Sequence, residues 1–188
     1  MDQAWLICGP CIANPPAHDG VLAAVAYGDI ARRVALRLKY GRKLGLASVM
    51  AGLMRRHAAA FPDAMLVPVP LHWSRLWHRG FNQSLQIARS IAGQTEQKLH
   101  ANLLVRVRRT QSLGGLGKAA RAREVRGVFA FNTKADVADV RGHDVLLVDD
   151  IYTTGATANA CARLLKRKGA RSVHILCWAR VLQDGFEH

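Results

Sequence analysis

Two adjacent aspartates directly after an apolar run are the side chains in this sequence with the clearest chemical use. Residues 145–148 read Val-Leu-Leu-Val, and Asp149 and Asp150 follow at once. In open α/β sheets, ligands bind beyond the carboxyl ends of the strands, so a strand here would present both carboxylates to a ligand. Ionised carboxylates only accept hydrogen bonds, which suits them to the hydroxyl groups of a polyol.

The turn after the aspartates has the composition of an anion-binding loop. It contains one glycine, Gly155, among three threonines, Thr153, Thr154 and Thr157. A helix is predicted over residues 156–168, and the backbone N–H groups at its start, with the threonine hydroxyls, would bind a phosphate. A phosphate beside a polyol describes a phosphorylated sugar. The alternative is an ordinary strand–turn–helix with an acidic turn.

Short apolar segments and amphipathic segments alternate along the rest of the chain. This alternation predicts an α/β fold with a mostly parallel sheet and crossover helices. The predicted strands are residues 21–27, 65–69, 102–107, 128–131, 144–148 and 172–178. The predicted helices are 29–39, 44–57, a third that starts at Asn82 or Ser84 and runs to residue 92, and 156–168.

Three local features refine this pattern. Asp29 is the predicted N-cap of its helix, with Ile30, Val34 and Leu38 on one apolar face. Gly169 is the predicted C-cap of the last helix. Residues 108–126 are rich in Gly, Arg and Ala without a consistent period, so we expect a mobile loop that is disordered without ligand.

Composition limits the classes of partner. The chain has 188 residues, half of them apolar, which suits one α/β domain. Its formal net charge of +14 favours anionic partners: phosphorylated metabolites, nucleic acid or a membrane surface. No apolar run approaches the ~20 residues of a membrane span. No basic stretch precedes the short apolar run at residues 4–7, so this run is not a secretory signal, and we expect a soluble, cytoplasmic protein.

The four cysteines do not form a disulfide framework, which fits a reducing compartment. Cys8 and Cys11 form a Cys-x-x-Cys knuckle, which is half of a structural zinc site. His18 is a candidate third ligand, but no fourth is apparent nearby, so we expect no stoichiometric Zn²⁺ here. Cys161 and Cys177 lie in apolar patterns and are predicted core residues.

The segment from Val145 to Thr157 resembles the phosphoribosyl-diphosphate motif of type I phosphoribosyltransferases, with four apolar residues, two acids and then Thr-Gly-x-Thr. The resemblance implies that Asp149 and Asp150 bind the ribose hydroxyls. It also implies magnesium on the diphosphate, held mostly by ligand oxygens. The residues implied to hold the 5′-phosphate are Thr153, Thr154, Gly155, Ala156 and Thr157.

Residues 67–75 and 79–83 resemble the competence-protein-F (ComF) family, as do residues 39–42 and 127–129. By analogy with that family, the turn after Val69 is a diphosphate loop. Leu71 and His72 would offer backbone N–H groups there, and Arg75 and Arg79 would neutralise the diphosphate. The alternative for these arginines is a solvated basic face.

The resemblance implies a type I phosphoribosyltransferase fold, with a sheet flanked by helices. Residues 1–20 would be a truncated zinc-ribbon-like segment and residues 21–188 a phosphoribosyltransferase-like domain. We expect binding of phosphoribosyl diphosphate, or a related 5-phosphoribosyl ligand, with magnesium. Whether the chain is an enzyme that transfers the phosphoribosyl group to an acceptor stays open.

A second hypothesis is a non-catalytic ComF-type protein that acts in single-stranded DNA uptake and natural transformation, with competence-machinery proteins as partners. Trp73 and Trp77 lie among Arg75 and Arg79, so they could stack on bases while the arginines hold phosphates. The alternative is that both tryptophans pack under the loop.

Overall fold

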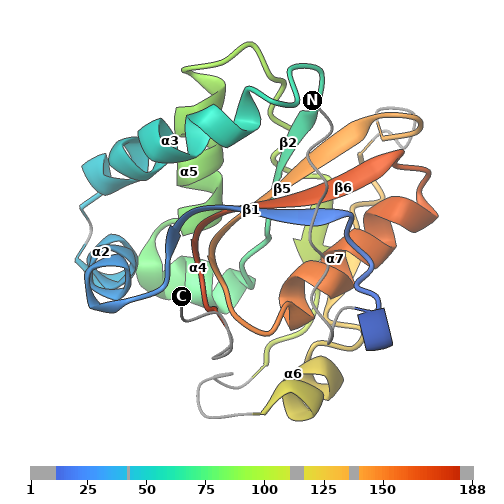
Figure 1. Ribbon diagram of the computed structural model, residues 1–188. Helices are drawn as coiled ribbons and strands as arrows, with labels where there is room; N and C mark the ends of the chain where they lie inside the picture. Colours follow the sequence, from blue (N-terminus) through green and yellow to red (C-terminus); the bar gives the residue numbers. More distant parts are fainter. Residues whose placement is uncertain (1–11, 42, 111–116, 136–139, 183–188) are drawn as a thin grey trace.

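A parallel sheet forms the centre of this computed structural model, which describes residues 12–41, 43–110, 117–135 and 140–182 (Figure 1). Because β5 and β6 are central, the apolar residues 145–148 of β5 are fully buried. The sheet confirms the predicted fold class. Its order is β1 (Gly20–Ala26), β6 (Ser172–Arg180), β5 (Asp144–Tyr152) and β2 (Met65–Pro68), and every pair is parallel.

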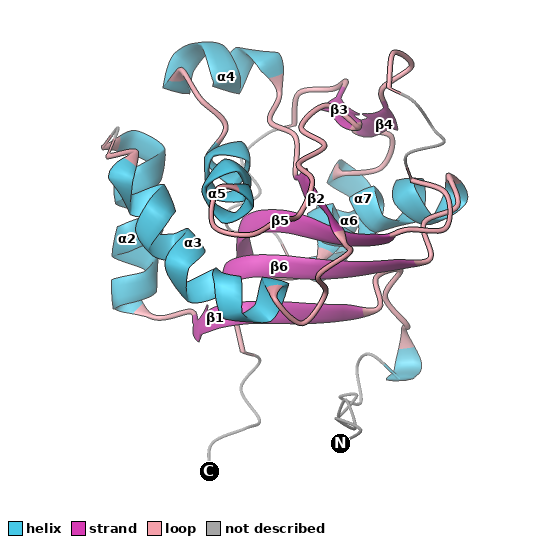
Figure 2. Cartoon of the chain, turned by 90° about the horizontal axis from the view of Figure 1, so that it is seen from above, coloured by secondary structure: helices cyan, strands magenta, loops and turns pink. Residues whose placement is uncertain are grey.

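Helices cover both faces of this sheet, as Figures 1 and 2 show. Successive strand residues point to opposite faces, so Leu146 and Val148 join one core while Val145 and Leu147 join the other. Both faces are therefore apolar, as a buried parallel sheet requires. The first core contains residues of α2 (Asp29–Tyr40), α3 (Gly45–Ala58) and α5 (Gln83–Ala92), and the second contains residues of α7 (Ala156–Arg167).

A smaller antiparallel pair and two short helices complete the described structure. The pair consists of β3 (Leu104–Arg106) and β4 (Phe129–Phe131). The short helices are α4 (Trp73–Arg79) and α6 (Lys118–Glu124). No helix in the described ranges is long and apolar enough to cross a membrane.

The start and the buried face of α2 differ from the prediction. Gly28, not Asp29, is the N-cap. Asp29 lies in the first turn, where its negative charge interacts favourably with the helix dipole. Ala31, Ala35 and Leu38 face the core, whereas Ile30 is 75% exposed. The small alanines permit a close approach to the sheet, where the indole N–H of Trp178 donates to the Ala31 carbonyl at 3.2 Å.

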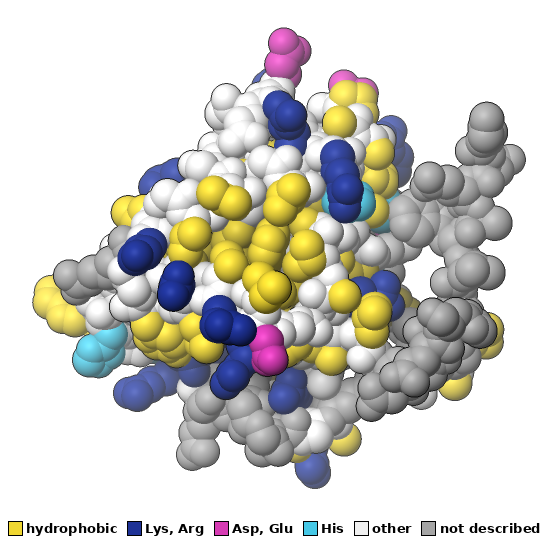
Figure 3. Space-filling model, turned by 60° about the vertical axis from the view of Figure 1, so that its left-hand side comes forward, with side chains coloured by type: hydrophobic (Ala, Val, Ile, Leu, Met, Phe, Trp, Pro, Cys, Tyr) yellow, Lys and Arg dark blue, Asp and Glu magenta, His cyan; other side chains and the backbone are white. Residues whose placement is uncertain are grey.

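Apolar side chains also remain at the surface of α2 and α3. Figure 3 shows such side chains gathered on the side of the molecule that these helices occupy, with Lys and Arg around them. Ile30, Val49 and Leu53 are among the exposed ones. An apolar pattern along α2 therefore did not identify the side that packs on the sheet.

Both short helices fall where the sequence predicted none. The predicted loop 108–126 contains α6, while its residues 111–116 lie outside the described ranges. Ala, Lys, Arg and Glu favour helix, but α6 has no apolar stripe that would reveal it. The turn after Val69 likewise continues into α4, which ends at Gly80 with φ of 79°. At the end of α7, the C-cap is Lys168, one residue before Gly169.

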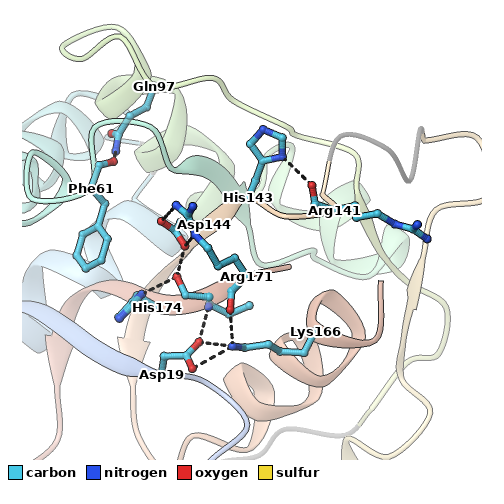
Figure 4. Close-up of polar contacts among 11 residues, drawn as sticks. Asp19, Phe61, Gln97, Arg141, His143, Asp144, Lys166, Arg171 and His174 are labelled. Atoms are coloured by element: carbon cyan, nitrogen blue, oxygen red, sulfur yellow. Dashed lines mark hydrogen bonds and ion pairs between the residues drawn. The ribbon is translucent and has the colours of Figure 1, made fainter. Parts of the chain in front are cut away.

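Polar contacts fasten the amino ends of β5 and β6, as Figure 4 shows. Asp19 accepts a hydrogen bond from the Val173 N–H at 2.6 Å and pairs with Lys166 at 2.7 Å. Asp144 accepts a hydrogen bond from the Ser172 hydroxyl at 2.7 Å and forms an ion pair with Arg171. The Arg171 guanidinium lowers the pKa of Asp144 to about 2. This edge is anchored internally, and the candidate site lies at the opposite, carboxyl edge.

Candidate functional site

The carboxyl end of β5 contains both aspartates. We had predicted that the strand ends at residue 148 and that the aspartates follow it. Instead the strand runs to Tyr152, so Asp149 and Asp150 are its sixth and seventh residues. Both side chains line a cavity of about 320 Å³. They have different partners, and this difference separates their roles.

The side chain of Asp150 forms an ion pair with another residue of the protein. Its carboxylate lies 2.5 Å from the Nζ atom of Lys39, which is near the end of α2. The Asp150 residue is 5% exposed, so its charge is balanced by a partner that is itself largely shielded from water. Removal of this carboxylate would leave the Lys39 ammonium without its counter-ion.

Asp149 is half-buried and is held by two donors. Its Oδ1 atom accepts a hydrogen bond from the Ser84 hydroxyl at 3.0 Å and another from the Asp150 N–H at 2.9 Å. Burial, and then the neighbouring Asp150 carboxylate, raise the pKa of Asp149 to about 7. A cation or hydroxyl donors from a ligand would relieve this unfavourable charge.

The turn between β5 and α7, together with the first residues of α7, forms a cradle made of residues 153–157, and this cradle adjoins Asp149. Gly155 is the N-cap of α7 with φ of 75°, a conformation that glycine adopts without strain. Within the described ranges, no side-chain cap bonds the first turn of α7, so its N–H groups are available to an anion. This cradle surrounds a small hollow of about 70 Å³, lined by residues 151–158, Asp149 and Arg121.

Two arginines from outside the motif reach this region. Arg121 of α6 donates from Nη1 to the Thr153 hydroxyl at 3.0 Å, so it lies over the cradle. Arg106 of β3 lines the main cavity, and its guanidinium lies 5.3 Å from the centre of the Phe129 ring. Burial lowers the pKa of Arg106, but a guanidinium remains charged at neutral pH.

The two arginines of α4 line the same cavity. Arg75 donates from Nη2 to the Thr110 carbonyl at 3.3 Å. Arg79 donates to the side-chain carbonyl of Gln83 at 3.3 Å, and its guanidinium lies 5.1 Å from the centre of the Tyr40 ring. The cavity thus combines two carboxylates with arginines that arrive from three separate elements.

The structure brings together most of the residues that the sequence singled out. His72 is not among the lining residues: its imidazole caps α4 by accepting a hydrogen bond from the Ser74 N–H at 3.3 Å. The main cavity is lined by Leu71, Arg75, Arg79, Asp149, Asp150, Thr153 and Thr157, and the adjoining hollow by Thr154, Gly155 and Ala156.

The predicted half zinc site cannot be located, because both of its cysteines, Cys8 and Cys11, are in the undescribed N-terminal segment. His18 is buried, and its Nε2 atom lies 3.0 Å from the Tyr152 hydroxyl. Within the described ranges, no group of three or more His, Cys, Asp or Glu side chains could hold a metal ion.

Reasoning from the residues alone did not assign a site role to Lys39, Ser84, Arg106 or Arg121. Lys39 lies in a segment that resembles the ComF family, and this was its only signal. Ser84 follows the N-cap Asn82 by two residues and is buried, so it reads as an ordinary helix start. Arg106 and Arg121 lie among many other arginines, and local sequence does not separate them from the rest.

Comparison with known proteins shows which families and proteins this chain is similar to. Residues 83–188 match the family model described as "Phosphoribosyl transferase domain". The chain is 30% identical to the DNA utilization protein YhgH of Salmonella typhi, over 94% of this chain and 79% of that protein. It is 26% identical to competence protein F of Haemophilus influenzae, over 92% of this chain and 78% of that one. Among solved structures, TT1426 from Thermus thermophilus matches with a TM-score of 0.42 and 18% identity, over 75% of this chain and 86% of that one.

Proposed function

We propose that this chain binds phosphoribosyl diphosphate, or a related 5-phosphoribosyl compound, with magnesium. The chain belongs to the phosphoribosyl transferase domain family and, within it, to the competence protein F group. One observation carries the proposal. The uncapped start of α7 and the carboxylate of Asp149 line the same small hollow. A phosphate and a ribose ring attached to it would need these two kinds of group side by side.

Each part of the ligand has residues of matching chemistry. The 5-phosphate would accept hydrogen bonds from the cradle, residues 153–157, with Arg121 above it. The ribose hydroxyls would donate to Asp149, whose raised pKa favours such donors. The diphosphate would lie towards Leu71, Arg75 and Arg79, where guanidinium groups make bidentate contacts to phosphate.

The donor set at Asp149 fits magnesium. Both hydrogen bonds that Asp149 accepts from described residues go to Oδ1, so Oδ2 is available to a cation or to its water ligands. Magnesium is usually bound by one or two carboxylates together with substrate phosphates. When bound, it would supply positive charge that offsets the charge of the diphosphate.

Transfer of the phosphoribosyl group is the reaction that such a site supports. The bond between the anomeric carbon and the diphosphate oxygen breaks, a nucleophile of the acceptor forms a new bond to that carbon, and diphosphate leaves. Arg75 and Arg79 would stabilise the departing negative charge.

The test is calorimetric titration of the chain with phosphoribosyl diphosphate and with ribose 5-phosphate, each with and without magnesium. Asp149→Asn keeps the Oδ1 acceptor but removes the charge, and a charge-assisted hydrogen bond contributes about 1.5–3 kcal/mol. We therefore expect affinity to fall by a factor of about 10 or more. Asp29→Asn removes an exposed carboxylate of α2 and serves as the matched control. The absence of saturable binding by the unaltered chain, or an unchanged affinity of Asp149→Asn, would refute the proposal.

Two exposed tryptophans on α4 favour a second candidate function, the binding of single-stranded DNA. Trp73 and Trp77 of α4 are 72% and 86% exposed, so the alternative that they pack under the loop is wrong. Base stacking on such side chains contributes about 1–3 kcal/mol per base. The net charge of +14 and the names of the relatives, a DNA utilization protein and a competence protein, support the same function.

Fluorescence anisotropy with a labelled single-stranded oligonucleotide tests this function. Binding should weaken steeply as salt rises, because phosphate contacts release counterions. Trp73→Ala with Trp77→Ala should weaken binding by a factor of about 10 or more, given the stacking free energy above. The double variant Val49→Ala with Leu53→Ala removes exposed apolar side chains of α3 and should bind normally. Equal losses in both double variants would count against stacking on α4.

A further inference from the structure

A second hollow lies between α6 and α7, which Figures 1 and 2 both show as neighbours. Its volume is about 560 Å³, compared with about 320 Å³ for the cavity at the aspartates. Neither aspartate lines it. This volume is typical of pockets that bind small organic molecules.

Four exposed arginines line this hollow. Arg123 and Arg126 come from the end of α6 and the residues after it, while Arg163 and Arg167 are one turn apart on α7. Within the described ranges, no hydrogen bond or ion pair involves any of these guanidinium groups; the recorded ion pairs belong to other residues. Four like charges around one hollow repel each other, so an anion with several charges would be stabilised there.

The floor of the hollow is apolar. Val125 and Phe129 are buried there, and the half-buried Leu164 extends the same surface. Phe129 is also held from the direction of the main cavity, since the Arg106 guanidinium lies 5.3 Å from its ring centre. An anion that used only its charge would have no need of this surface. The combination suits a ligand with several anionic groups on one part and a flat, weakly polar body on another.

We infer that this hollow binds an organic polyphosphate of the nucleoside di- or triphosphate class. Its phosphates would contact the four arginines, since guanidinium groups make bidentate contacts to phosphate. Its base would lie on the floor formed by Phe129 and Leu164, where an arginine can also stack on a planar ring. This site is separate from the proposed phosphoribosyl site and does not depend on it.

The experiment is calorimetric titration of the full chain with adenosine triphosphate, without any phosphoribosyl compound. Arg163→Ala with Arg167→Ala should weaken binding by a factor of at least about 10, because two charge-assisted contacts are lost. Both side chains are exposed and have no recorded partner in the described ranges, so the melting temperature should not change. The matched control is Arg32→Ala with Arg33→Ala, which removes two exposed arginines of α2.

Asp149→Asn should bind adenosine triphosphate like the unaltered chain, because Asp149 does not line this hollow. A loss of binding in that variant would place the nucleotide at the main cavity and overturn the inference. So would the absence of saturable binding, or an equal loss in the two arginine double variants. Inorganic tripolyphosphate should bind more weakly than adenosine triphosphate, and equal affinity would overturn the assignment of a nucleoside. Dependence on Arg163 and Arg167 for a single-stranded oligonucleotide, but not for adenosine triphosphate, would also refute it.

Discussion

Replacement of Asp150 by asparagine should destabilise the protein even without a ligand. The Asp150 carboxylate lies 2.5 Å from the Nζ atom of Lys39, and their side chains are 7% and 20% exposed. Loss of one partner from a buried pair costs about 3–5 kcal/mol, and because Lys39 keeps some contact with water we expect about 3 kcal/mol. In a protein of this size, this corresponds to a melting temperature lower by about 6–12 °C.

A double-mutant cycle isolates the pair. Lys39→Met with Asp150→Asn removes both charges, and replacement of a whole buried pair is often close to neutral. The double variant should therefore melt well above Asp150→Asn alone. Thermal unfolding followed by circular dichroism measures all four proteins. A melting temperature of Asp150→Asn equal to that of the unaltered chain, or a double variant as unstable as the sum of the single ones, would refute the reasoning.

Asp149→Asn should behave in the opposite way. Burial and the Asp150 carboxylate raise the pKa of Asp149 to about 7, so the folded state binds its proton more tightly than the unfolded chain does. The protonated group therefore stabilises the fold below about pH 4, and this contribution is lost as pH rises towards 7. At pH 8, Asp149→Asn should melt above the unaltered chain, and near pH 4 the two should agree. Equal melting temperatures at both pH values would contradict the raised pKa.

Three further predictions concern the rest of the structure. Gly155→Ala should destabilise the fold by about 1–3 kcal/mol, because alanine is strained at a φ of 75° and its Cβ would lie 2.9 Å from a tyrosine ring carbon; Gly52→Ala in α3, where the space is open, should not. Asp144→Asn should lower the melting temperature clearly at pH 7 and much less at pH 2. The pKa of Asp144 near 2 means that its stabilising charge is fully present above the unfolded value and is lost as pH falls through 2. In a variant whose two N-terminal cysteines are replaced by serine, Cys161 and Cys177 should stay unreactive towards Ellman's reagent at pH 8 until the chain unfolds. The reason is that burial raises the pKa of the Cys177 thiol to about 12 and that of the Cys161 thiol further.

Long apolar or amphipathic segments were readily predicted from the sequence. The structure confirms a strand or helix at each predicted position, and β5 and β6 differ from the prediction mainly by their longer carboxyl ends. These elements have strong periodicity or a continuous apolar run, so short-range pattern is sufficient. The short helices α4 and α6 were missed because seven residues offer too few positions to show a period.

The cradle was also accessible to sequence reasoning, because its parts are contiguous. Residues 149–157 contain the acids, the glycine and the threonines in one short segment, and a strand followed by a helix must bring them to one edge of the sheet. Adjacent residues along the chain stay adjacent in space. The order of residue types was therefore sufficient to locate the candidate site.

The partners of those residues were decided only by the tertiary structure. Lys39 precedes Asp150 by more than a hundred residues, yet the packing of α2 on the sheet places their charges in contact. Ser84 reaches Asp149 in the same way, and Arg121 reaches Thr153 from α6. One sequence with 27 basic side chains does not reveal which of them meets which acid, because that depends on crossing helices and strand order. The chain itself determines its elements and its contiguous motif, whereas the distribution of charge around that motif follows from packing between distant segments.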